Sequence, residues 1–232
     1  MCTVTYLPLG NNDFMLTSNR DEDPKRKTTE PKKYIEEEVE LFYPKDSLAG
    51  GTWIGLSDKN RLVCLLNGGF ENHTKKTKYR HSRGIIVKQL LTSDDAVKYV
   101  EDLDLTDIEP FTIVLVDWNN LLAAYELVWT GEEKAFKKLS QEPHVWSSST
   151  LYTEEMKQLR RDWFSNWLNE REKFTQESVL AFHLDDSKDP EVSPKMKRFF
   201  VETVSVTSVV KKEESVTMDY HDLVTEKSEE KV

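Results

Sequence analysis

MCTVTYLPLGNNDFMLTSNRDE, residues 1–22, is the stretch that decides the fold. Two short runs with β-strand character, residues 1–8 and 14–22, flank a tight polar turn at Gly10-Asn11-Asn12, so the stretch predicts a β-hairpin. In an antiparallel hairpin the start of the first strand lies beside the end of the second. Cys2 is therefore expected close to Arg20 and Asp21.

The surroundings predicted for Cys2 are those of an activated nucleophile, because a cation and a carboxylate would flank its thiol. Cysteine is small enough for a preceding initiator methionine to be trimmed, so we expect Met1 to be absent from the mature protein. The free α-amino group of Cys2, which titrates near neutral pH, could then take the thiol proton without a histidine. The alternative is a cysteine that fills the strand as a small hydrophobe.

Three motifs follow one another in the order of a known family. They are Leu16-Thr17-Ser18-Asn19-Arg20-Asp21-Glu22 after the opening Met-Cys-Thr-Val, then Gly51-Thr52-Trp53-Ile54-Gly55, then Asn67-Gly68-Gly69-Phe70. Over the stretch that ends at Phe70 the chain resembles the NRDE family, also called the transport and Golgi organization 2 family. The rest of the chain matches only in its order of elements.

That family in turn resembles the cysteine N-terminal-nucleophile enzymes of the choloylglycine hydrolase and penicillin V acylase group. The resemblance implies an α+β fold, a four-layer αββα sandwich of two stacked antiparallel sheets with helices outside. It also implies a catalytic set in which Cys2 attacks an amide carbonyl, Arg20 holds the thiolate, Asp21 hydrogen-bonds the α-amine and the Asn67 amide donates to the oxyanion. The supporting positions are Asn19, Glu22, Trp53 and Ser148.

Two positions depart from the acylase pattern. The relatives tend to carry Ser-Asn where this chain has Ser147-Ser148, and a serine hydroxyl donates one hydrogen bond where an Asn amide offers two. The relatives also often place an Arg on a late strand, where our register puts Val204. Both departures favour a binding protein built on the same scaffold over an efficient acylase.

The rest of the chain predicts hairpins interleaved with helix pairs. A surface loop is expected at residues 23–33, which are rich in Pro, Thr and charge, and a short edge element at residues 36–42. Further strands are expected at residues 52–57, 61–66, 111–118, 121–129, 144–147, 199–210 and 215–224, and helices at residues 84–91, 93–103, 153–170 and 175–184. In the third helix Met156, Leu159, Trp163 and Trp167 are expected to face the core. This order suggests two stacked antiparallel sheets in a single domain, residues 1–224, followed by a charged tail at 225–232.

Two segments keep two interpretations each. Asn67-Gly68-Gly69 is either part of an oxyanion site, because paired glycines permit close backbone approach, or an ordinary strand-ending turn. The basic segment of residues 73–83 is either a solvated loop or a surface that meets an anionic substrate tail.

Composition narrows the classes of function. A net charge of −10 argues against general nucleic-acid binding, which needs Lys and Arg to neutralise phosphates. No apolar run reaches the about eighteen residues of a membrane span, and no signal peptide is expected before Cys2. The two cysteines, Cys2 and Cys64, argue against a disulfide framework and fit a reducing compartment, so we expect a cytoplasmic protein. No CxxC, HExxH, GxGxxG or GxxxxGK pattern occurs, so neither a metal nor a nucleotide cofactor is expected.

The leading hypothesis is therefore a cysteine N-terminal-nucleophile hydrolase whose partner is a small-molecule amide. The second is a non-catalytic carrier of a hydrophobic ligand, such as a lipid or a haem-like molecule, or a protein with a role in trafficking. A third, a purely structural interaction protein, rests only on the acidic surface. Neither nucleic acid nor a membrane span is expected, and the sequence leaves the oligomeric state open.

Overall fold

The computed structural model describes residues 3–224. The expectations for Met1, Cys2 and the tail at 225–232 lie outside the described residues. Contacts divide the chain into two compact units. The first comprises the described residues up to Lys25 together with those from Glu142 onwards, and the second is Arg26–Gln141. The single domain expected from the sequence stays a prediction.

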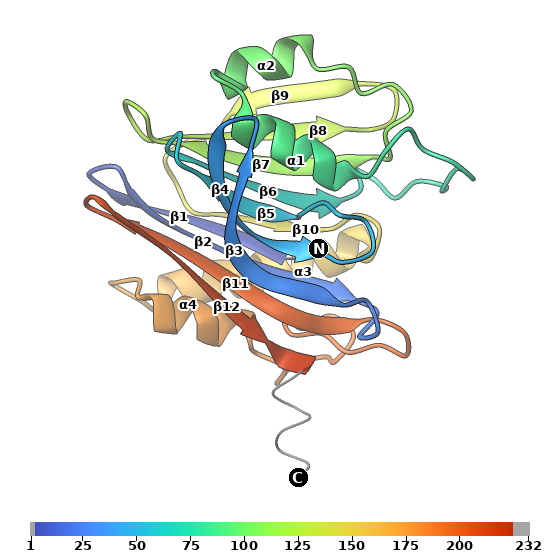
Figure 1. Cartoon of the computed structure of the whole chain (residues 1–232). Helices are drawn as coiled ribbons and strands as arrows, with labels where there is room; N and C mark the ends of the chain where they lie inside the picture. Colours follow the sequence, from blue (N-terminus) through green and yellow to red (C-terminus); the bar gives the residue numbers. More distant parts are fainter. Residues whose placement is uncertain (1–2, 225–232) are drawn as a thin grey trace. The chain divides into compact units, whose positions relative to one another are not determined.

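The first hairpin is confirmed (Figure 1). Strand β1, Thr3–Gly10, pairs with β2, Asp13–Glu22, in the register Thr3 with Asn19 and Val4 with Ser18. Asn11 and Asn12 have φ values of 50° and 64°, the two consecutive left-handed residues of a type I′ turn. Asn tolerates that conformation better than most residues, which explains why the Gly-Asn-Asn sequence turns here.

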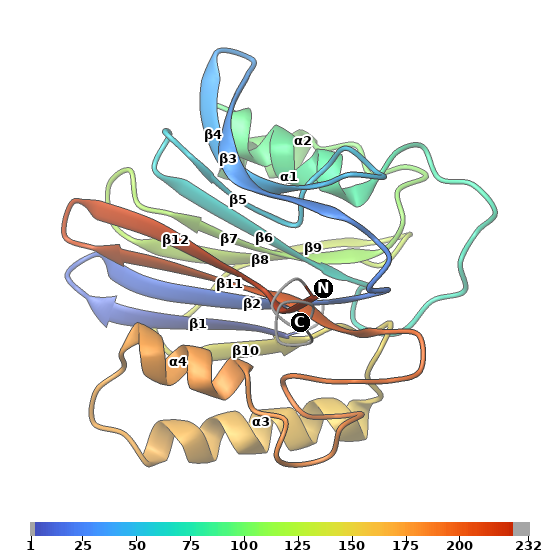
Figure 2. The same ribbon diagram turned by 60° about the horizontal axis from the view of Figure 1, so that its bottom comes forward.

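The first unit contains a five-stranded antiparallel sheet in the order β10-β1-β2-β11-β12. The three further strands are β10, His144–Ser147, β11, Glu202–Lys212, and β12, Ser215–Asp222. Helices α3, Glu154–Asn169, and α4, Gln176–His183, cover one face of this sheet (Figure 2). The apolar side chains between sheet and helices are Leu7, Met15, Phe164, Trp167, Val179 and Phe182.

The buried stripe of α3 differs from the expected one. Arg160, Phe164 and Trp167 are the buried residues of this helix, whereas Leu159 is 45% exposed. The buried face therefore includes a charged side chain, Arg160, in place of the apolar Leu159. Trp167 is confirmed as a core residue, and Trp163 packs at the border of the same cluster.

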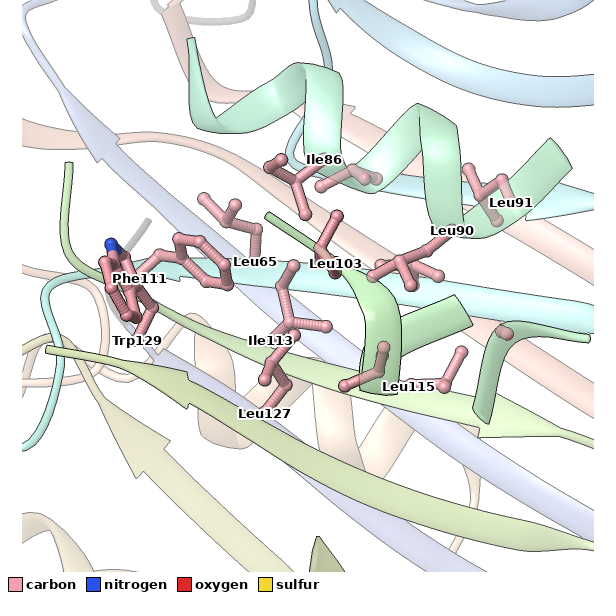
Figure 3. Packing of buried hydrophobic residues seen from close by; sticks show 14 of the residues in the cluster. Leu65, Ile86, Leu90, Leu91, Leu103, Phe111, Ile113, Leu115, Leu127 and Trp129 are labelled. Carbon is pink, nitrogen blue, oxygen red and sulfur yellow. The ribbon is translucent and has the colours of Figure 1, made fainter. Parts of the chain in front are cut away.

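The second unit contains a seven-stranded antiparallel sheet in the order β3-β4-β5-β6-β7-β8-β9. Its elements are β3, Thr28–Glu36, β4, Val39–Asp46, β5, Ile54–Ser57, β6, Arg61–Asn67, α1, Arg83–Thr92, α2, Ala96–Asp102, β7, Phe111–Asp117, β8, Ala123–Trp129, and β9, Lys134–Lys138. Figure 3 shows Ile86, Leu90 and Leu91 of α1 lying over Leu65 and Ile113 of the sheet. The helices therefore close one face of this sheet with an apolar core.

The surface loop expected at residues 23–33 is wrong, because most of it belongs to β3. Pro31 lies where the β3–β4 register shifts between Thr29 and Lys32, a bulge that tolerates a residue without an N–H. The strand is the edge of its sheet, and charged side chains are a common feature of such edges. β9, the opposite edge, is also rich in Lys and was not predicted.

None of the helices within residues 3–224 is long and apolar enough to cross a bilayer.

Candidate functional site

The end of β2 carries three buried polar side chains in a row. Asn19 is fully buried, and Arg20 and Asp21 are each 3% exposed. Successive side chains of a strand point to opposite faces, so Arg20 faces away from the side on which Asn19 and Asp21 lie. The contacts of Asn19 and Asp21 show that their side is the face covered by α3 and α4.

The Asp21 carboxylate is held by two hydroxyl groups from distant parts of the chain. Tyr152 Oη donates to Oδ2 at 2.9 Å, and Thr203 Oγ1 donates to Oδ1 at 2.6 Å. Thr203 also lies opposite Asp21 in the β11–β2 register. The carboxylate is therefore fixed in place rather than free to turn.

Arg160 lies behind Tyr152 and is 1% exposed. Its Nη2 donates to Tyr152 Oη at 2.8 Å and to the carbonyl of Ser193 at 2.6 Å, and its Nε donates to the carbonyl of Val192 at 2.7 Å. Its Nη1 donates to the Thr3 hydroxyl. A buried cation thus connects through a tyrosine to Asp21 and also holds the first described residue of β1.

A second buried network surrounds Asn19. Its Nδ2 donates to the carbonyls of His183 at 2.9 Å and Pro194 at 2.8 Å, and its Oδ1 contacts His183 Nδ1. Because Asn19 Oδ1 is an acceptor, His183 carries its proton on Nδ1, and Nε2 accepts from the Thr5 hydroxyl at 2.7 Å. Burial, with a smaller contribution from the Arg160 charge, lowers the pKa of His183 to about 3. Asn19 therefore ties the hairpin to α4 through a neutral imidazole.

His183 should make the folded state sensitive to mild acid. The pKa of His183 is about 3 in the folded state and ordinarily 6.5, so between these two pH values the imidazole is protonated in the unfolded chain but neutral in the folded one. Stability is then fully present above pH 6.5 and is lost as the pH falls, by up to about 1.4 kcal/mol per pH unit. We expect the melting temperature of His183→Gln to depend less on pH below pH 6.5 than that of the wild type. A His81→Gln variant, altered at the surface, should keep the wild-type slope; equal slopes in all three proteins would contradict the prediction.

Three other positions considered in the sequence, Glu22, Ser148 and Val204, also belong to the first unit. Glu22 ends β2, and its carboxylate accepts from the Asp23 N–H at 3.0 Å at the start of the following loop. Ser148 follows β10 and is buried, with its hydroxyl 3.0 Å from that of Thr150. Val204 lies in the bulge of β11, between Thr203 and Ser205, and is also buried.

Asn67 and Trp53 belong to the second unit. Asn67 is the last residue of β6, and Gly68 after it has a φ of 87°, a left-handed conformation that glycine adopts without strain. A Cβ on Gly69 would lie 2.9 Å from the Trp129 carbonyl oxygen, so a glycine is needed there too. The paired glycines thus allow the chain to turn after β6 and to pack closely against the Trp129 backbone. The oxyanion site and the strand-ending turn both remain possible interpretations of these glycines. Trp53 is buried beside β5, and its carbonyl accepts from Leu65 N–H at 2.7 Å.

The basic segment of residues 73–83 pairs with acidic residues of the same unit. Arg83 Nη2 lies 3.1 Å from Glu109 Oε2, and His73 Nε2 lies 3.4 Å from Glu109 Oε1. Arg80 binds Asp104. These contacts favour the solvated loop over a surface for an anionic substrate.

Sequence analysis did not identify Tyr152, Arg160, His183 or Thr203 as site residues. Arg160 and His183 did leave a signal, since each is a polar residue at helical spacing among apolar ones, four residues before Phe164 and four after Val179. Tyr152 and Thr203 had no local signal, because they reach Asp21 across 131 and 182 residues of chain.

Comparison with known proteins gives one family and a set of similar structures. The family model described as Transport and Golgi organisation 2 matches residues 1–223. A Caenorhabditis elegans ortholog of N-acylethanolamine-hydrolyzing acid amidase superposes with a TM-score of 0.62 at 14% identity, over 89% of this chain and 92% of that one. No curated protein sequence matches.

Two bacterial enzymes are also similar in structure. An arginine-to-leucine variant of conjugated bile acid hydrolase from Clostridium perfringens gives a TM-score of 0.51 at 11% identity, over 97% of this chain and 93% of that one. Penicillin V acylase from Agrobacterium tumefaciens gives 0.53 at 11% identity, over 96% and 86%. At such identities the likeness establishes the fold alone, which is the N-terminal-nucleophile-hydrolase-like fold with two antiparallel sheets and four helices.

Proposed function

This chain belongs to the Transport and Golgi organisation 2 family, and we propose that it is a cysteine N-terminal-nucleophile amidohydrolase that cleaves a linear amide bond. Cys2, with Met1 removed, is the nucleophile. Its α-amine takes the thiol proton while the sulfur bonds to the amide carbonyl carbon. The same proton then passes to the leaving nitrogen as the carbon–nitrogen bond breaks. Water hydrolyses the resulting thioester and releases the acid.

The register of the first hairpin carries this proposal. Thr3 lies opposite Asn19, so the pairing continued by one residue would set Cys2 opposite Arg20, a buried cation. A guanidinium beside a thiol favours the thiolate. Thr3 is held by β2, by β10 and by Arg160, so the residue bonded to Cys2 has a fixed position. A catalytic nucleophile needs a backbone position that is fixed in this way.

The Asp21 carboxylate is the partner proposed for the α-amine. A carboxylate offers about four lone-pair positions, and its contacts include those from the Tyr152 and Thr203 hydroxyls. In this proposal Asp21 fixes the amine for proton transfer, and Arg160 balances its charge through Tyr152. The oxyanion role of Asn67 rests on the family resemblance alone.

Alkylation tests the proposed nucleophile directly. We expect intact mass to show that Met1 is absent, and iodoacetamide to label Cys2 but not Cys64 in the folded protein, because Cys64 is fully buried in β6. The rate at Cys2 should fall less between about pH 8 and about pH 6 than that of free cysteine, since Arg20 favours the thiolate. Retention of Met1 would overturn the amine-base mechanism, and a pH dependence like that of free cysteine would overturn the activated thiol.

A carrier of a hydrophobic ligand is the second candidate. The Ser148 hydroxyl can donate one hydrogen bond where an Asn amide offers two, and the Val204 side chain provides no polar group. Two positions of the acylase pattern therefore offer fewer donors to the reacting amide. Such a protein would bind the same amphiphilic molecules without cleaving them. The Cys2→Ala experiment in the Discussion separates these two functions.

A further inference from the structure

Two neighbouring residue pairs on β2 and β11 have the same chemistry but different contacts. Thr17 lies opposite Ser208, and Ser18 lies opposite Thr207. All four side chains are buried. The hydroxyls of Thr17 and Ser208 bond to each other at 3.0 Å, whereas those of Ser18 and Thr207 have no hydrogen-bond partner among residues 3–224.

The unpaired hydroxyls lie on the face of the sheet that also carries Arg20. Strand alternation puts Ser18 and Arg20 on one side of β2, and the register puts Ser205 opposite Arg20. The Ser205 hydroxyl is buried and has no partner in the described part of the chain either. Arg20, Ser18, Ser205 and Thr207 thus form a two-by-two block of neighbours, which we call the hydroxyl block.

The hydroxyl block is costly for a protein that only needs to fold. A buried hydroxyl without a partner costs about 1–3 kcal/mol, and three of them lie together here. Valine or alanine would fill the same positions of a buried strand without that cost. The pair Thr17–Ser208, one residue away, shows that these strands can satisfy hydroxyl groups where they face the helices.

We propose that the hydroxyl block binds the carboxylate of a small organic acid. Its three hydroxyls can all donate, and the neighbouring Arg20 guanidinium adds positive charge. A carboxylate is the compact group that accepts from all of them, with about four acceptor positions and one negative charge. Towards β1 and along the strands the next residues on the same face, Val4, Leu16 and Val209, are apolar, whereas Tyr220 and Asp222 of β12 lie opposite Thr207 and Ser205. An apolar tail of the acid would therefore extend towards Val4 and Leu16, away from the Asp222 carboxylate.

The carboxylate has two possible sources, the acyl part of an amide or an acidic group on its other half. The first is the acid released by hydrolysis, and the second belongs to the intact molecule. The binding site goes beyond the proposed function, because it stands even if no amide is hydrolysed. Octanoate and N-octanoylglycine represent the two sources, and octanamide and N-octanoylglycinamide are their neutral counterparts.

The test measures binding of these four compounds by calorimetry in a Cys2→Ala background, which removes turnover. Thr207→Val deletes an unpaired hydroxyl at nearly constant volume, so we expect an unchanged or higher melting temperature together with about ten- to hundredfold weaker binding of the carboxylate. Ser208→Ala is the matched control on the same strand. It breaks the hydrogen bond to Thr17, so it should lower the melting temperature and leave binding unchanged.

The site is supported if Thr207→Val weakens binding without loss of stability while Ser208→Ala loses stability without weaker binding. Whichever of octanoate and N-octanoylglycine binds, and binds more weakly to Thr207→Val, identifies the source of the carboxylate. Equal binding of the acids and their neutral amides would overturn the proposal. So would carboxylate affinity that Thr207→Val and Ser18→Ala leave unchanged. Hydrolysis of amides by the wild type alongside either of these results would leave the proposed function standing and remove only the carboxylate site.

Discussion

Replacing Cys2 with Ala is expected to abolish amide hydrolysis and to leave ligand binding nearly unchanged. The sulfur bonds to the substrate only during the reaction, so its loss removes transition-state stabilisation without weakening the ground-state complex. Loss of a catalytic nucleophile lowers kcat by about 10⁴-fold or more. The measurement is a screen of N-acyl amino acids and related amides with wild type and Cys2→Ala side by side, with lipid and haem binding followed on both proteins.

Cys64→Ala is the matched control, because it removes the other thiol of the chain from the interior of β6. It should keep the activity and lose only a little stability. Hydrolysis that disappears in Cys2→Ala alone supports the amidohydrolase. Tight binding by both proteins with no hydrolysis by the wild type would instead identify a carrier.

The first hairpin was predictable because its signals are local. Gly10, Asn11 and Asn12 adopt the left-handed conformations that their residue types favour, and they set the pairing that brings the end of β2 beside the start of β1. The strand that ends at Asn67 was predictable for the same reason, since an apolar run stops at paired glycines. Local signals therefore identified Arg20 and Asp21 as candidates, whereas the candidate role of Asn67 came from the family resemblance.

The edge strand β3 was not predicted because its composition is typical of a loop, whereas its pairing with β4 makes it a strand. Pro31 and a run of charged residues indicate a loop, yet Tyr34 and Ile35 pair with β4 and the proline lies at a bulge. Strand propensity depends strongly on context, and an edge strand tolerates charge on its solvent side. Nothing within residues 23–33 reveals that β4 lies beside them.

The partners of Asp21 and Asn19 could not be predicted because they come from the far end of the chain. Tyr152, His183 and Thr203 meet the first hairpin only after α3, α4 and β11 have packed against it. The sequence gives candidates for reactive groups, whereas the side chains that hold those groups depend on tertiary contacts. A polar residue within an apolar helical stripe, as at Arg160 and His183, predicts burial of that residue but does not reveal its partner.

Arg160→Met is expected to destabilise the protein more than any other single replacement in these networks. The guanidinium donates to the carbonyls of Val192 and Ser193, to Tyr152 and to Thr3, and methionine can donate to none of them. Removing one member of a buried charged network costs about 3–5 kcal/mol. For a chain of this size that lowers the melting temperature by about 6–20 °C.

The neighbouring residue provides the control for this effect. Arg161 pairs with Glu154 at 2.5 Å at the helix surface, with 41% and 68% of the two side chains exposed. Exposed pairs contribute about 0–1 kcal/mol, so Arg161→Met should melt within a few degrees of the wild type. Tyr152→Phe removes only the hydroxyl between Arg160 and Asp21. Its melting temperature should therefore lie between those of Arg160→Met and Arg161→Met. If Arg160→Met melted like Arg161→Met, Arg160 could not be what holds Thr3, and the fixed position of the nucleophile would need another explanation.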